Sequence, residues 1–167
     1  MDFTKVFYNN CKEKKRYILN QGGTRSSKTV SLMQIAYFLA YKNRDKPITI
    51  SVTSETMPHL RRGAMKDFFD FLNREKIYTP SAFNKTNFVY TIGKAKIEFF
   101  SVDSPDRVHG PGRDYLFCNE IQNFGCIRLQ MVVSLYRFVC LPVACQPGHF
   151  FFNQFSFFCC CFMFNWI

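Results

Sequence analysis

The chain has 167 residues, of which 22 are Lys or Arg and 12 are Asp or Glu, and its formal net charge is +10. This length accommodates one ordinary domain with a hydrophobic core and excludes a large multidomain machine. The excess of positive charge favours phosphate-rich partners such as DNA, RNA or nucleotides.

The N-terminal third of the chain predicts a strand, a glycine-containing turn and a helix. The first ten residues lack the continuous apolar run of a secretory signal, so we expect a cytoplasmic location. Residues 14–20, KKRYILN, are apolar between charges and precede two glycines, which is typical of a strand entering a turn. Residues 28–42 have the apolar spacing of a mostly buried helix. This order is the context that a phosphate-binding loop requires.

The next elements alternate between strand and helix. β-branched residues predict a strand, apolar residues at three- and four-residue spacing predict a helix, and a Gly-Lys turn predicts a hairpin. In chain order we expect a strand at 47–53, a helix at 57–76, hairpin strands at 88–92 and 96–102, a loop at 103–113 and a strand at 115–118. Alternating units of this kind predict a largely parallel sheet covered by helices.

The composition changes near residue 124. All acidic residues lie at or before Glu120, whereas 125–167 holds nine of the 21 Phe and six of the eight Cys, with no C-x-x-C pair for zinc. The apolar run 131–145 is interrupted by Arg137 and is shorter than the ~20 residues that span a bilayer. We therefore expect a domain at 1–124 followed by a non-native, frameshifted or misjoined tail. A buried core segment and a membrane-associating tail are the alternatives.

The motif Gly22-x-x-x-x-Ser27-Lys28-Thr29 matches a phosphate-binding loop except for its second glycine. Successive backbone N–H groups and the helix N-terminus hold phosphates, and Ser27 supplies an N–H as glycine does, provided that its φ is negative. Lys28 would reach the β- and γ-phosphates of ATP, and the Thr29 hydroxyl would bind Mg²⁺. The alternative is a polar turn with a helix cap.

A second element, the run DYLFCNE at 114–120, is typical of a buried strand that carries a carboxylate to the sheet edge. Glu120 would orient or deprotonate the attacking water. Asn119 stands where such enzymes usually have Asp, and an amide is a weaker magnesium ligand than a carboxylate. Metal binding would then depend on Thr29, Asn119 and the nucleotide. The alternative is a strand that ends in an exposed polar pair.

Three stretches, KKRYILNQGGTRSSKT, SVTSETMPHLRRGAMKDFFDF and IEFFSVDSPDRVHGPGRDYLFCNEIQNF, resemble the N-terminal ATPase part of the large terminase subunit of tailed bacteriophages. The resemblance covers residues 12–124. It implies a truncated α/β P-loop NTPase of the additional-strand class, with an incomplete parallel sheet, flanking helices and Glu120 as the catalytic carboxylate. It also implies that Arg25 can act on the γ-phosphate; the alternative is a solvated or phosphate-neutralising arginine. The nucleotide-binding residues that it implies are Gly22, Gly23, Thr24, Arg25, Ser26, Ser27, Lys28 and Thr29.

The resemblance further implies a role in viral DNA packaging. ATP hydrolysis would be coupled to translocation of double-stranded DNA, together with a small terminase subunit, the capsid portal and further copies of the protein, in the host cell cytoplasm and without stable membrane association. Arg61 and Arg62 would contact DNA or another domain, or form a solvated helix face. The chain has no carboxylate beyond Glu120, which excludes two-metal nuclease chemistry in it. The alternatives are another P-loop nucleic-acid motor, such as a helicase, and a small basic membrane-associated protein.

Overall fold

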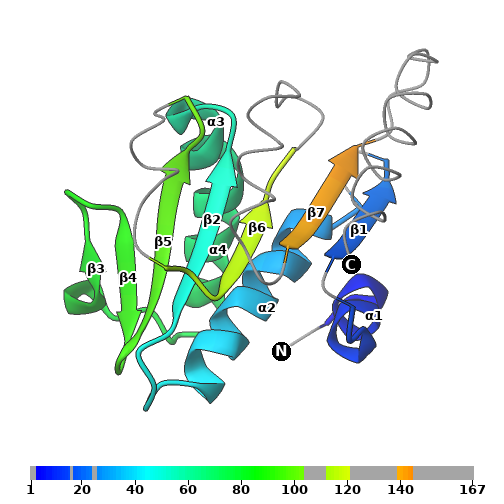
Figure 1. The fold of residues 1–167 in the computed structure, drawn as a ribbon. Coiled ribbons are helices and arrows are strands. Elements are labelled where there is room, and N and C mark those ends of the chain that lie inside the picture. The colour runs from blue at the N-terminus through cyan, green and yellow to red at the C-terminus, as the bar shows by residue number, and fades with distance from the viewer. Residues whose placement is uncertain (1–2, 16, 24–25, 104–111, 121–138, 145–167) are drawn as a thin grey trace.

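The computed structural model describes residues 3–15, 17–23, 26–103 and 112–120, and the backbone of 139–144. Its strands are β1 (Tyr17–Gly22), β2 (Thr49–Ser54), β3 (Phe83–Asn84), β4 (Val89–Ile92), β5 (Ala95–Ser101), β6 (Tyr115–Cys118) and β7 (Val139–Ala144). They form one sheet in the order β1-β7-β6-β2-β5-β4-β3 (Figure 1). The first five strands of this order are parallel, whereas β4 and β3 extend the sheet antiparallel. The carboxyl ends of the parallel strands therefore share one edge.

One of the two expected helices is observed with its expected bounds, whereas the other is divided. They are α1 (Lys5–Lys12), α2 (Lys28–Lys42), α3 (Met57–Leu60), the π-helix η1 (Arg61–Met65), α4 (Lys66–Arg74) and the 3-10 turn η2 (Pro80–Ala82). The range 57–76 was expected to be one continuous helix, but a π-helical turn divides it. That turn contains Gly63, whose lack of a side chain lets the backbone approach the end of β6 closely. Single π-helical turns of this kind occur frequently at functional sites.

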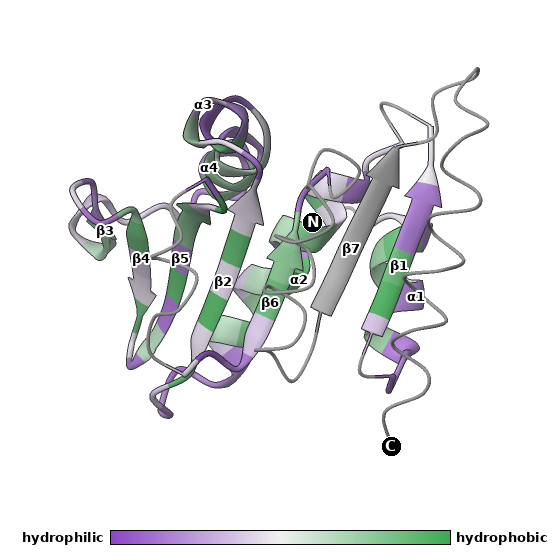
Figure 2. Cartoon of the chain, turned by 45° about the horizontal axis from the view of Figure 1, so that its top comes forward, coloured by the Kyte–Doolittle hydropathy of each residue, from purple (hydrophilic) through white to green (hydrophobic). Residues whose placement is uncertain are grey.

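The core lies between one face of the sheet and the helices α2, α3 and α4 (Figure 1). Ile50 and Val52 of β2 are fully buried, and Ser51 between them points to the other face, as the two-residue period of a strand requires. Phe68 of α4 packs against Phe99 of β5 with ring centroids 5.4 Å apart. Figure 2 shows the apolar character of α2 and of the central strands that it covers. This packing places α2 against β5 and α4.

Helix α1, which we did not predict, lies beside β1 and α2. The side-chain amides of Asn10 and Asn20 exchange two hydrogen bonds of 2.9 Å, which join α1 to β1. The Thr4 hydroxyl caps α1 by accepting from the Phe7 N–H (3.2 Å) and also bonds to the Ser31 hydroxyl of α2. These contacts fix the outer strand that leads into the 22–29 loop.

Strand β7 comes from the segment that we expected to be misjoined. It lies between β1 and β6 and pairs in parallel with both. Pro142 of β7 stands opposite Asn20 of β1 in this interior position. Residues 121–138 and 145–167 lie outside the described part, so the origin of the segment stays a prediction.

Candidate nucleotide-binding site

The loop between β1 and α2 holds the ammonium group of Lys28. Its Nζ donates to the carbonyl oxygens of Gly22 (2.8 Å) and Gly23 (2.7 Å) and to the Ser26 hydroxyl (2.7 Å). Lys28 is only 9% exposed, and a buried charge of this kind needs such partners. Phosphate oxygens make shorter and stronger hydrogen bonds with an ammonium group than neutral carbonyls do. The loop therefore presents a cation that a polyanion can draw away from the backbone.

Ser27 adopts the left-handed conformation that the motif usually assigns to glycine. Its φ is +56° and its ψ is +19°, and its side chain makes no capping hydrogen bond to α2. The condition set for tolerating serine here, a negative φ, is therefore not met. A non-glycine residue in this region costs about 1–2 kcal/mol because Cβ approaches the following carbonyl oxygen. The strain explains why glycine is the usual residue at this position.

A hydrogen bond joins the start of α2 to the end of β6. The Thr29 hydroxyl donates to Oδ1 of Asn119 at 3.1 Å. The backbone of Asn119 is held by β2, because its N–H donates to the Thr53 carbonyl (2.7 Å) and its carbonyl accepts from the Ser54 hydroxyl (3.3 Å). Asn119 is 5% exposed. The structure thus brings together the two residues predicted as metal ligands.

Glu120 follows Asn119 at the exposed side of the same edge. Its φ is +55°, so it also takes the left-handed conformation. Its side chain is 50% exposed, and its Oε2 lies 4.0 Å from Nδ1 of His59 on α3. Strained backbone conformations of this type cluster at functional sites. The carboxylate stands one residue away from the amide that contacts Thr29.

Among the described residues, the two side chains that meet between α2 and β6 offer a divalent cation neutral oxygens. Thr29 and Asn119 offer a hydroxyl and an amide oxygen, which hard cations accept, and Glu120 offers the one carboxylate at the end of β6. Within the described residues, no group of three or more His, Cys, Asp or Glu side chains is placed to hold a metal ion. Mg²⁺ would fit this set if phosphate oxygens of a bound nucleotide supplied most of its ligands and Thr29 and Asn119 supplied the others.

Other predicted residues are placed differently. Thr24 and Arg25 lie outside the described residues, so the structure does not test the role predicted for Arg25. The guanidinium of Arg61 lies over the Phe88 ring, 4.8 Å from its centroid, which attaches η1 to the segment before β4. Arg62 is exposed. Arg61 therefore contacts a neighbouring segment of the same domain through Phe88, whereas the Arg62 side chain faces solvent.

Two residues at the site were missed by the sequence reasoning, His59 and Gly63. His59 belongs to no motif recognised in the sequence, yet α3 places it beside Glu120. A Cβ atom on Gly63 would lie 3.3 Å from Nδ2 of Asn119. A glycine inside an otherwise regular helical pattern was the available signal for this close approach.

Comparisons with known proteins gave matches among solved structures. No protein-family model matches the chain, and no curated protein matches it. The large terminase of a thermophilic bacteriophage superposes with a TM-score of 0.71 at 13% identity, over 86% of this chain and 39% of the other. The same terminase in complex with ADP gives 0.65 at 14% identity, over 85% and 39%. The large terminase ATPase domain of Thermus phage P74-26 gives 0.58 at 11% identity, over 92% and 69%.

The fold and the loop between β1 and α2 define an α/β protein with the P-loop NTPase fold. More particularly, the chain has the fold of the ATPase domain of phage large terminases, which confirms the resemblance read from the sequence at the level of fold. The chain spans 39% of the thermophilic phage terminase that it superposes on with a TM-score of 0.71. None of the helices in the described ranges has the length and apolar character needed to cross a membrane.

Proposed function

We propose that this chain is the ATP-binding and ATP-hydrolysing part of a viral DNA-packaging motor. The observation that carries the proposal is the Thr29–Asn119 hydrogen bond, which joins the phosphate-loop helix to the strand end next to Glu120. The fold shared with terminase ATPase domains, and with a terminase in complex with ADP, supports the same reading.

The proposed roles follow from the chemistry of the residues. The backbone N–H groups of Gly22–Thr29 cradle the phosphates, and Lys28 neutralises the charge that develops on them. Glu120 orients or deprotonates the attacking water, because its half-exposed carboxylate follows the strand end. Arg25 acts on the γ-phosphate from within the loop.

Thr29 and Asn119 would hold Mg²⁺. When bound, the ion supplies positive charge to the β- and γ-phosphate oxygens. The protein side chains keep the phosphate chain and the water in register for in-line attack. The pairing of Thr29 with Asn119 supports this assignment, because it gathers two oxygen ligands at one point of the edge.

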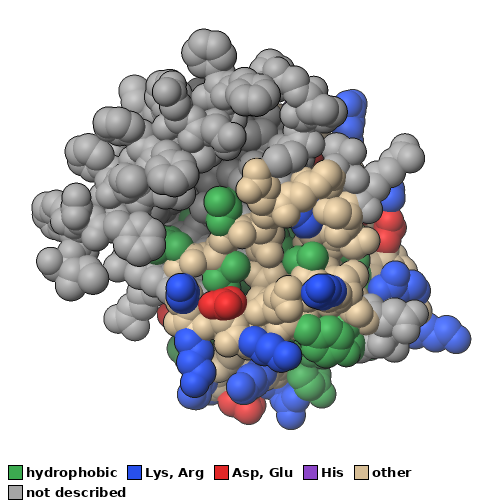
Figure 3. All heavy atoms as spheres, turned by 90° about the vertical axis from the view of Figure 1, so that its right-hand side faces the viewer, with side chains coloured by type: hydrophobic (Ala, Val, Ile, Leu, Met, Phe, Trp, Pro, Cys, Tyr) green, Lys and Arg blue, Asp and Glu red, His purple; other side chains and the backbone are tan. Residues whose placement is uncertain are grey.

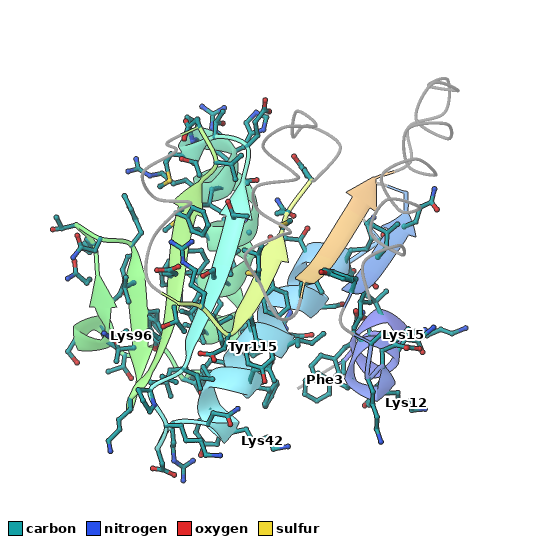
Figure 4. All side chains as sticks on the ribbon, in the orientation of Figure 1. Phe3, Lys12, Lys15, Lys42, Lys96 and Tyr115 are labelled. Atoms are coloured by element: carbon teal, nitrogen blue, oxygen red, sulfur yellow. The ribbon has the colours of Figure 1, made fainter. Side chains whose placement is uncertain are left out.

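Double-stranded DNA is the proposed polymer substrate of the intact motor. The net charge of +10 supports an anionic partner. Seen from the side of α1 and β1, Lys and Arg side chains gather over part of the surface (Figure 3). Lys12 and Lys15 point away from the sheet there (Figure 4). A small terminase subunit, the capsid portal and further copies of the chain are the proposed protein partners, in the host cell cytoplasm.

The experiment that tests the proposal is equilibrium binding of a fluorescent ATP analogue to the whole chain. Lys28→Ala should weaken binding at least about tenfold, since each hydrogen bond to a charged group contributes about 1.5–3 kcal/mol. Lys42→Ala is the matched control, because Lys42 lies at the other end of the same helix (Figure 4). Glu120→Gln should bind the analogue and lose hydrolysis. Equal binding by the wild type and Lys28→Ala would remove the assignment.

We also propose that residues 125–167 are an out-of-frame or misjoined continuation. Pro142 supports this, because proline cannot donate to a ladder and is avoided in strands with neighbours on both sides. Translation of the encoding DNA in the other two frames after codon 124 tests the idea. Charged, patterned protein is expected in one of them, and its absence from both contradicts the proposal.

A further inference from the structure

We propose that Asn119 makes nucleotide binding at this site nearly independent of magnesium. Each nucleotide, ATP or ADP, then binds with about the same affinity whether or not the ion is present. This inference rests on the proposed function of the loop, and it concerns what the amide at 119 does in the place where a carboxylate is usual.

The first support is that the Asn119 amide is held in one position. Its side-chain oxygen accepts from Thr29, its N–H donates to Thr53, and its carbonyl accepts from Ser54. With 5% exposure it has little room to turn toward solvent. The neutral amide therefore faces the phosphate-loop helix whether or not a metal is present.

The second support is the packing behind the amide. The Asn119 Nδ2 lies so close to Gly63 of η1 that an added Cβ would stand 3.3 Å away. The π-helical turn and the glycine thus leave the space that this amide occupies. In the folded chain, the hydrogen bond between Thr29 and Asn119 already joins the loop helix to β6, a connection that needs no ion.

The third support is the balance of charge. Lys28 supplies a positive charge within the loop, while Asn119 supplies none of the negative charge that an aspartate would place beside the phosphates. Glu120 is half exposed and has His59 beside it. A carboxylate at 119 would repel a bare triphosphate and would need a cation between the two, since like charges at close range disfavour each other. The amide avoids this repulsion.

The test compares binding of a fluorescent ATP analogue by the whole chain in excess Mg²⁺ and in excess EDTA. For the wild type, the two dissociation constants should agree within about threefold, a difference of about 0.65 kcal/mol. Asn119→Asp should bind at least about tenfold more weakly in EDTA and recover when Mg²⁺ is added. Lys42→Ala, at the far end of α2, should leave the wild-type agreement between the two dissociation constants unchanged.

The outcomes separate this inference from the proposed function. A wild-type affinity that falls by more than about threefold in EDTA overturns the inference but leaves nucleotide binding intact. Binding that is absent in both conditions, or unaffected by Lys28→Ala, overturns both. If Asn119→Asp does not fold, as judged by its thermal unfolding, the wild-type comparison decides the question alone.

Discussion

The Thr29 hydroxyl donates a 3.1 Å hydrogen bond to the side-chain oxygen of Asn119, a residue 90 positions away in the chain. This contact joins the first turn of α2 to the end of β6, two strands away from β1 in the sheet. Neighbouring strands lie about 4.8 Å apart, so a span of about 10 Å separates β1 from β6. The hydrogen bond therefore ties two distant parts of the edge into one site.

Replacing Thr29 tests this tie directly. Thr29→Val keeps the shape but leaves the buried Asn119 oxygen without its donor, which should cost about 1–3 kcal/mol of the free energy of unfolding. Thr29→Ser retains the hydroxyl and should cost less. Urea unfolding curves of the three proteins measure the difference. Equal losses for Val and Ser would show that the hydroxyl contributes nothing.

Ser27 is expected to be a strained residue that glycine would relieve. Its φ of +56° costs about 1–2 kcal/mol, and glycine would remove this cost. Glycine also has more freedom in the unfolded chain, which offsets about 0.5–1 kcal/mol of the stabilisation. Ser27→Gly should therefore raise the free energy of unfolding by about 0.5–1 kcal/mol. Ser27→Ala keeps Cβ and should give no gain. Thermal unfolding of both variants checks the prediction, and a gain with alanine would contradict it.

His59 is expected to help position Glu120 during hydrolysis. The two side chains are 4.0 Å apart and both about half exposed, and an ion pair of this kind contributes at most about 1 kcal/mol. His59→Ala should therefore lower kcat by up to about fivefold without raising KM. Arg62→Ala, on the adjoining π-helix, is the control. Steady-state hydrolysis separates the two, and an equal fall in both variants would rule out a specific role for His59.

Asp67 of α4 makes the free energy of unfolding depend on pH in the acid range. Partial burial raises the pKa of its carboxyl above the usual 3.8, Lys66 lowers it and Asp70 raises it further. The folded state then binds a proton more readily than the unfolded state, so stability from this group is lost as pH rises through the range above 3.8.

Asp67→Asn removes that loss. The variant should melt at a higher temperature than the wild type at neutral pH, and the gap should close as pH falls below 3.8. Asp45→Asn, which removes an exposed carboxylate, is the control. Melting temperatures measured across this range check the sign. A gap that widens toward acid pH would contradict the account.

Local patterns predicted several elements closely. The helix expected at 28–42 and the strand expected at 115–118 have those bounds in the structure, because each depends on apolar spacing within a few turns or residues. The strand expected at 47–53 is observed as Thr49–Ser54. The fold class followed from the alternation of such elements and is confirmed.

Features that depend on contacts between distant segments could not be predicted in this way. The π-helical turn at Arg61–Met65 accompanies the close approach of Gly63 to Asn119, which helical periodicity does not encode. The pairing of β7 between β1 and β6 likewise joins segments that composition separates. His59 lies beside Glu120 because of how α3 packs, and this contact between distant residues has no signal in the local sequence. The candidate site was therefore predicted as a set of residues but not as a geometry.

Native-state amide hydrogen exchange with and without ATP tests the central claim most directly. If the backbone N–H groups of Gly22–Thr29 grip the phosphates, ATP should slow exchange in this segment in the wild type and not in Lys28→Ala. The end of β6 at Cys118–Glu120 should be protected together with it. Exchange in Gly22–Thr29 that ATP leaves unchanged would contradict the account, whatever protection appears elsewhere in the chain.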